Sequence, residues 1–134
     1  MKRNRSSTSI WLATIVLAHL VISVAHGTAH TRAYVPLSLA ANIYVFVVIV
    51  AGPLIGLGLT WRNQRIGNWL IALTMTAALV FGFVNHFVFA SPDHVAHVDP
   101  DWRPLFTTTA VLLVISETMG SGMAVRSMWP RRLR

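Results

Sequence analysis

Residues 69–90 read WLIALTMTAALVFGFVNHFVFA and contain no lysine, arginine, aspartate or glutamate. A helix rises about 1.5 Å per residue, so about 20 residues cross the hydrocarbon core of a bilayer. The stretch also lacks the polar stripe that marks a surface helix of a soluble protein. It therefore predicts a transmembrane helix that is apolar on all sides.

Three other stretches of the chain have the same character. We expect four spans at about residues 10–27, 36–60, 68–90 and 104–125. Helices joined by short connections pack as antiparallel neighbours. The sequence therefore predicts an all-α integral membrane protein in which residues 1–134 form one domain, an up-down bundle of four transmembrane helices.

The composition fits this class and excludes several others. Hydrophobic residues make up 54% of the 134 residues and charged residues 11%, whereas a soluble domain is about one quarter charged. The mean hydropathy is +0.60. Cysteine is absent, which excludes disulfides, thiolate metal sites and iron–sulfur clusters.

The basic residues indicate how the bundle lies in the membrane. The net charge is +7, and only two of the eleven basic residues, Arg32 and Arg103, fall on one side of the predicted spans. The other nine share the opposite side: Lys2, Arg3, Arg5, Arg62, Arg65, Arg126, Arg131, Arg132 and Arg134. Basic residues collect in cytoplasmic loops. We therefore expect a multi-pass protein of the plasma (inner) membrane with both termini cytoplasmic, and we expect no nucleic-acid partner.

Histidines and acids gather on the opposite, outer side. The outer loop runs from Ser91 to Arg103 and holds three of the four acids, Asp93, Asp99 and Asp101. Serine, proline and aspartate in succession at residues 91–93 are typical of a helix start. The loop is therefore expected to contain a short helical turn.

This outer end predicts a metal site. His26 and His30 are four residues apart, which puts both side chains on one face of a helix, and Asp93 and His97 have the same spacing. Imidazole and carboxylate ligands suit zinc, copper or iron. The candidate ligands for a transition metal ion are His26, His30, His86, Asp93, His94 and His97. The alternative is that these histidines are interfacial and loop residues without a ligand.

Two ionisable residues lie deeper. Glu117 is in the middle of the fourth span, where an ionised and unpaired carboxylate costs at least several kcal/mol. His19 is at a similar depth in the first span. We expect them to face each other inside the bundle, as candidate catalytic residues in a proton relay, as ligands of a deeper metal, or as a structural latch. Asn42 and Asn85 are candidate cofactor-binding members of the same polar network.

These placements support three functional hypotheses. The first is a membrane metalloprotein with a His/Asp-rich site at its outer end that acts as an oxidoreductase on a small apolar or membrane-dissolved substrate. The second is a non-enzymatic accessory subunit or a small transporter, working as a homo-oligomer or in a larger membrane complex. The third is a b-type haem protein that exchanges electrons with quinone, which needs two imidazoles at matched depth on different helices.

Overall fold

The structure is a computed structural model that describes residues 3–129, and no strand occurs among them. The elements, in which η denotes a π-helical segment, are α1 (Arg3–Arg32), α2 (Leu39–Tyr44), η1 (Val45–Ala51), α3 (Gly52–Thr60), α4 (Gln64–Phe83), η2 (Val84–Val88) and α5 (Arg103–Met128). Four helical stretches of the described chain are long and apolar enough to cross a membrane: Ser9–Arg32, Leu39–Thr60, Gln64–Val88 and Arg103–Met128. The predicted all-helical class with four spans is confirmed. The cytoplasmic placement of the termini stays a prediction.

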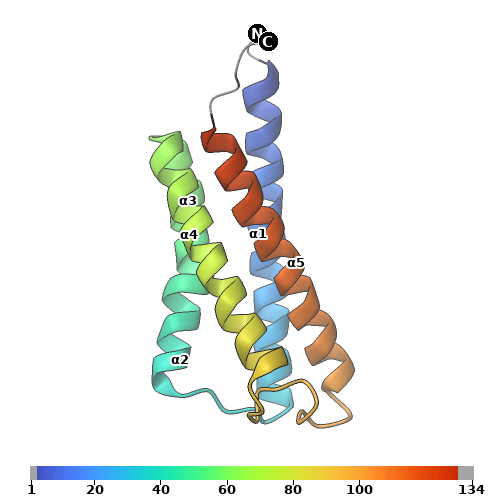
Figure 1. The fold of residues 1–134 in the computed structure, drawn as a ribbon. Helices are drawn as coiled ribbons and strands as arrows, with labels where there is room; N and C mark the ends of the chain where they lie inside the picture. Colours follow the sequence, from blue (N-terminus) through green and yellow to red (C-terminus); the bar gives the residue numbers. More distant parts are fainter. Residues whose placement is uncertain (1–2, 130–134) are drawn as a thin grey trace.

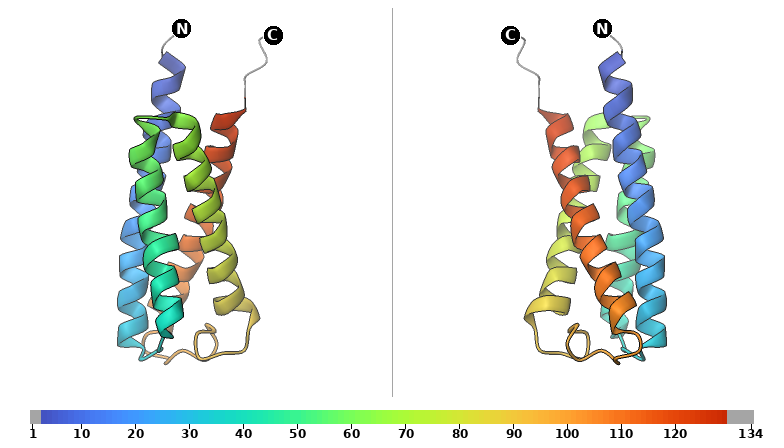
Figure 2. Two further views of the ribbon diagram at one scale, coloured as in Figure 1. Left: turned by 90° about the vertical axis from the view of Figure 1, so that its left-hand side faces the viewer. Right: turned by 90° about the vertical axis from the view of Figure 1, so that its right-hand side faces the viewer.

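The four spans run alongside one another as a bundle (Figures 1 and 2). α1 packs against α5, α5 against α4, and α4 against α3 and η1. The seam between α1 and the second span is the loosest, and α2 stands apart at the lower left of Figure 1. α1 begins and α5 ends at the same end of the bundle (Figure 2).

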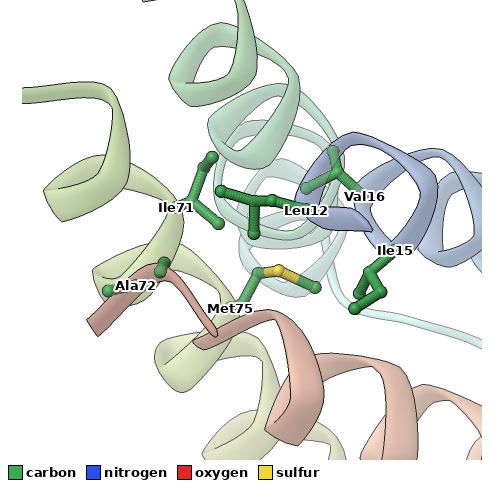
Figure 3. Close-up of a cluster of buried hydrophobic side chains, with 7 residues drawn as sticks. Leu12, Ile15, Val16, Ile71, Ala72 and Met75 are labelled. Carbon is green, nitrogen blue, oxygen red and sulfur yellow. The ribbon is translucent and has the colours of Figure 1, made fainter. Parts of the chain in front are cut away.

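The half of the bundle where α1 begins is tightly packed. Its buried side chains come from α1, α4 and α5 and are Leu12, Ile15, Val16, Ile71, Ala72, Met75 and Ala124 (Figure 3). Gly120 lets α5 approach α4, because a Cβ atom at this position would collide with the sulfur of Met75. Small residues at such contacts are the usual means by which membrane helices pack closely.

Widened turns interrupt the second and third spans. Pro53 has no backbone N–H and its ring crowds the preceding turn. Just before it, the Gly52 N–H donates to the carbonyl of Val47, five residues back. In η2 the Phe89 N–H likewise donates to the carbonyl of Val84. Such π-helical turns are rare and occur frequently at functional sites, and η2 carries the buried His86.

The outer loop closes one end of the bundle through apolar contacts. Val98 and Phe106 are buried with Ala29, Ala33 and Val35 in a second core cluster. Residues 91–102 form hydrogen-bonded turns, not the expected short helical turn. The physical reason is that the loop must fold back so that Val98 reaches the core. The side chain of Arg103 holds it there by donating to the Val98 carbonyl.

Candidate metal centre

Three histidines from two spans lie together under this loop. His26 and His30 project from the same face of α1, and His86 reaches them from η2. Their side chains are buried, with exposed fractions of 6%, 8% and 6%. One ring nitrogen from each lies within 4.8 Å of those from the others, so the cluster could hold a metal ion. We call His26, His30 and His86 the histidine cluster.

The hydrogen bonds around His26 and His86 determine where their protons sit. His86 Nδ1 is 3.0 Å from the backbone oxygen of Asp93, which can only accept, so Nδ1 carries the proton. His26 Nδ1 is 2.8 Å from the hydroxyl oxygen of Thr109. When the Thr109 hydroxyl donates to the carbonyl of Leu105, 2.8 Å away, its oxygen accepts from His26 Nδ1.

With this arrangement the two Nε2 atoms are both unprotonated. They lie 3.1 Å apart, His26 facing His86. Two imidazole lone pairs repel each other at this distance unless a cation lies between them. If the Thr109 hydroxyl instead donates to His26 Nδ1, the proton of His26 lies on Nε2 and is shared with His86 Nε2. The geometry therefore calls for a metal ion or a shared proton at this point.

Asp93 places a negative charge beside the cluster. Its Oδ1 atom lies 3.3 Å from His30 Nε2 and 3.2 Å from His86 Nδ1. Burial acts to raise the pKa of this carboxyl. Its contact with His86 and the positive potential of the three histidines outweigh burial and hold the pKa below its usual range. Asp93 therefore places a carboxylate beside the histidine cluster.

Phe106 keeps the cluster dry. Its fully buried ring lies with its centroid 4.7 Å from that of His26, 4.8 Å from His30 and 5.2 Å from His86. An apolar wall of this kind excludes water and strengthens electrostatic interactions inside the site. It also limits how far the three imidazoles can move.

The donor set fits a transition metal. Two nitrogens bound at ~2.0–2.1 Å to a tetrahedral zinc lie about 3.3–3.4 Å apart. The 3.1 Å between the Nε2 atoms of His26 and His86 is close to this distance. The ligand atoms of all three histidines lie within 4.8 Å of one another, so His30 has to move inward to ligate. Metal-ligating histidines donate their other N–H to a carbonyl or similar acceptor, as His26 and His86 do here.

The loop histidines lie outside the histidine cluster. His94 Nδ1 accepts from the Ala96 N–H, and His97 Nδ1 bonds to the Ser91 carbonyl. Their rings lie 5.3 Å apart, with His97 exposed. The structure thus brings together three of the candidate histidines with Asp93 and leaves these two on the loop backbone.

His19 and Glu117 form a separate buried pair. Glu117 Oε1 lies 3.3 Å from His19 Nε2, and the two residues are 2% and 1% exposed. The second oxygen, Oε2, is buried and has no hydrogen-bond partner among the described residues. Glu117 is eight residues beyond Thr109 in α5, about 12 Å deeper at the usual helical rise.

The two asparagines bond to their own helices instead. Asn42 donates to the carbonyls of Leu37 and Ser38 at the start of α2, and Asn85 donates to the carbonyl of Phe81. Asn42 is exposed. Neither side-chain amide reaches His19 or Glu117 through these bonds.

Two residues of the site escaped the sequence analysis, Thr109 and Phe106. A signal for them exists in the fourth span. The buried face of α5 consists of residues spaced three or four apart: Phe106, Thr109, Ala110, Leu113, Ser116, Glu117, Gly120 and Ala124. Thr109 and Phe106 share the face of Glu117, which sequence alone had assigned to the interior.

A cavity of about 320 Å³ joins the histidine cluster to Glu117. Side chains from all four spans line it, and most of its wall is apolar. Comparison with protein-family models, curated proteins and solved structures finds no match to the chain. The chemistry of the site therefore has to be argued from its own residues.

Proposed function

We propose that this membrane protein binds a transition metal ion through the histidine cluster and serves as an oxidoreductase for a membrane-dissolved substrate. One observation carries the proposal: the Nε2 atoms of His26 and His86 face each other at 3.1 Å, and a ring nitrogen of His30 lies within 4.8 Å of them. A metal ion at this point would be bound by neutral imidazoles from two spans.

A metal explains more of the site than a shared proton does. A proton between His26 and His86 would account for their spacing alone. His30 Nδ1 would still be buried without a hydrogen-bond partner among the described residues. A metal gives His30 a role as third ligand and leaves a fourth position for Asp93 or a substrate. Three protein ligands with one open position are typical of catalytic metal sites.

The ligand types narrow the choice of metal. Neutral imidazoles suit zinc, copper and iron, while the lack of cysteine removes thiolate ligands. Copper or iron would supply redox chemistry at the open position. The mostly apolar cavity that adjoins the cluster favours a substrate that arrives from the bilayer.

Haem is a poorer fit to the same residues. Two axial nitrogens on one iron lie about 4 Å apart, twice a metal–nitrogen bond of ~2 Å, with the macrocycle between them. The Nε2 atoms of His26 and His86 are 3.1 Å apart, and their rings meet edge to face with centroids at 4.8 Å. Phe106 fills the adjoining space.

Metal titration of the purified protein tests the proposal. Chelator-treated protein in detergent is titrated with Cu²⁺, Zn²⁺ and Co²⁺, and bound metal is counted by elemental analysis after desalting. We expect about one equivalent per chain for the wild type and for His97→Ala, a matched loop variant. We expect less than a tenth of that for His26→Ala and His86→Ala. A wild type that retains less than a tenth of an equivalent of every metal overturns the metal site and leaves the shared proton as the explanation.

A turnover assay tests the oxidoreductase part. The copper- or iron-loaded protein is mixed with a reduced, detergent-solubilised phenol and oxygen, and oxygen uptake is followed. Uptake that requires the bound metal and is lost in His86→Ala is expected. Equal uptake by the metal-free protein would contradict this part.

A further inference from the structure

The cavity beneath the histidine cluster has at its deep end a carboxyl oxygen without a hydrogen-bond partner among the described residues. Glu117 lines the cavity, and this atom is its buried Oε2. Its other oxygen, Oε1, lies 3.3 Å from His19 Nε2. Buried polar atoms are rarely left unpaired in native proteins. A bound molecule that hydrogen-bonds to Oε2 would complete the site.

The rest of the wall indicates an apolar body for this molecule. Besides the histidine cluster and Glu117, the wall includes the apolar side chains of Val45, Ile49, Ala78, Phe81, Leu113 and Val114. The hydroxyl of Ser23 also lines the cavity, but it donates to the His19 carbonyl. An engineered apolar cavity of about 150 Å³ holds one benzene molecule. A cavity of about 320 Å³ therefore has room for a substituted aromatic ring and the start of an alkyl tail.

The cavity opens on the flank between α1 and the second span. Gly27 and Thr31 of α1 and Asn42 of α2 all line it, and all three are exposed. α2 has no buried residue and stands away from α1 in Figure 1. These positions fall within the membrane spans. A molecule dissolved in the bilayer can therefore enter sideways, without passing the outer loop.

We propose that this cavity binds a membrane-dissolved phenol, with its hydroxyl group hydrogen-bonded to Glu117 Oε2 and its ring among the apolar side chains. A hydroxyl both donates and accepts, so it satisfies Glu117 in either protonation state. The aromatic rings of Phe81 and His86 in the wall suit an aromatic ligand. The choice of an oxidisable head group rests on the proposed oxidoreductase function, whereas the binding site itself does not.

Binding to the metal-free protein tests the site independently of the metal. The probes are 4-heptylphenol and its methyl ether, which lacks the O–H group and is larger by one methyl group. Chelator-treated protein in detergent is titrated with each by isothermal calorimetry. We expect the phenol to bind at least ten times more tightly than the ether. Equal affinities would overturn the role of Glu117, while metal uptake would still report separately on the histidine cluster.

Two variants connect the binding to the cavity. Glu117→Leu removes the acceptor, so the preference for the phenol over the ether should disappear. Gly27→Phe should fill the mouth and abolish binding of both probes, because Gly27 lines the cavity. The protein can accommodate this substitution, since a Cβ atom at Gly27 meets no atom within 4 Å. Gly58→Phe is the matched control, since Gly58 also has open space around its Cβ but lies outside the cavity. Retained binding in Gly27→Phe would overturn the proposed entry.

Further outcomes keep the test decisive. Because Glu117→Leu leaves His19 without its partner, the double variant His19→Leu/Glu117→Leu is measured as well and should show the same loss of preference. Folding of each variant is checked by its circular dichroism and its elution as a single species in detergent. Heptylamine binding more tightly than the phenol would overturn the assignment of a hydroxyl group. Decanol binding as tightly as the phenol would overturn the assignment of an aromatic ring.

Discussion

The Thr109 hydroxyl should control metal affinity without touching the metal. Its oxygen accepts from His26 Nδ1 at 2.8 Å, which leaves His26 Nε2 free to ligate. Thr109→Val keeps the shape of the side chain but removes this acceptor. In the metal-free variant His26 can switch tautomer and donate from Nε2 to His86, 3.1 Å away. Metal binding then has to reverse this switch.

The size of the effect follows from the buried N–H. In the metal-bound variant His26 Nδ1–H points at a methyl group, and a buried donor without a partner costs about 1–3 kcal/mol. This corresponds to a loss of affinity of roughly 5- to 150-fold, because 1.4 kcal/mol is a factor of about ten in an equilibrium constant. Mutations of residues that orient metal-ligating histidines typically cost about 10- to 100-fold, which agrees with this range.

Competition against a chelator of known affinity measures the change. Thr109→Ser restores the hydroxyl and should bind within a few-fold of the wild type. Thr108→Val is the matched control, because Thr108 is the exposed neighbour and its loss should leave affinity unchanged. An affinity of Thr109→Val equal to that of Thr108→Val would refute the tautomer argument.

Three further predictions concern the centre, the core and the deep pair. Asp93→Asn keeps the backbone carbonyl that orients His86 but removes a charge 3.3 Å from His30 Nε2. The chelator competition assay should therefore show a loss of metal affinity of about tenfold or more. Gly120→Leu should lower the free energy of unfolding by at least the ~1–3 kcal/mol typical of overpacking, because its Cβ meets Met75. Unfolding in mixed micelles measures the change. Gly122→Leu is the control, since a Cβ atom at Gly122 meets no atom within 4 Å, and an equal effect of the two substitutions would contradict the prediction. Glu117→Leu alone should destabilise by about 1–3 kcal/mol, because it leaves a buried ring nitrogen of His19 without a partner, and His19→Leu/Glu117→Leu should destabilise by less. Equal losses in the same unfolding assay would show that the 3.3 Å contact does not couple the two residues.

The sequence predicts the spans well because the membrane imposes one strong requirement. Every backbone polar group in lipid must be satisfied within the chain, so long apolar runs become helices. Helical spacing likewise places His26 and His30 on one face, and topology brings His86 to the same end. These inferences need only the helical repeat of the side chains and the direction in which each span crosses the membrane. They hold without knowledge of any side-chain contact.

The loop residues show where this reasoning stops. His94 and His97 have the same side chains as the cluster and lie in the same segment as Asp93. Their position depends on how the loop folds back, and that is decided by the burial of Val98 against Phe106. No periodic pattern encodes such a contact. Thr109 was overlooked for a different reason, because a threonine in a membrane helix is ordinarily satisfied by its own backbone, as Thr109 also is.

The π-helical turns explain why one half of the bundle can hold a site at all. Membrane helices gain little from hydrophobic association, so they pack closely where small residues permit, as at Gly120. In that half, the space enclosed among Leu12, Leu57 and Asn68 is only about 10 Å³. η1 and η2 interrupt the second and third spans in the other half, where Val45 and Ile49 of η1 line the cavity and His86 of η2 reaches the cluster. The irregular backbone, which costs stability, therefore falls where the histidine cluster and the cavity require it.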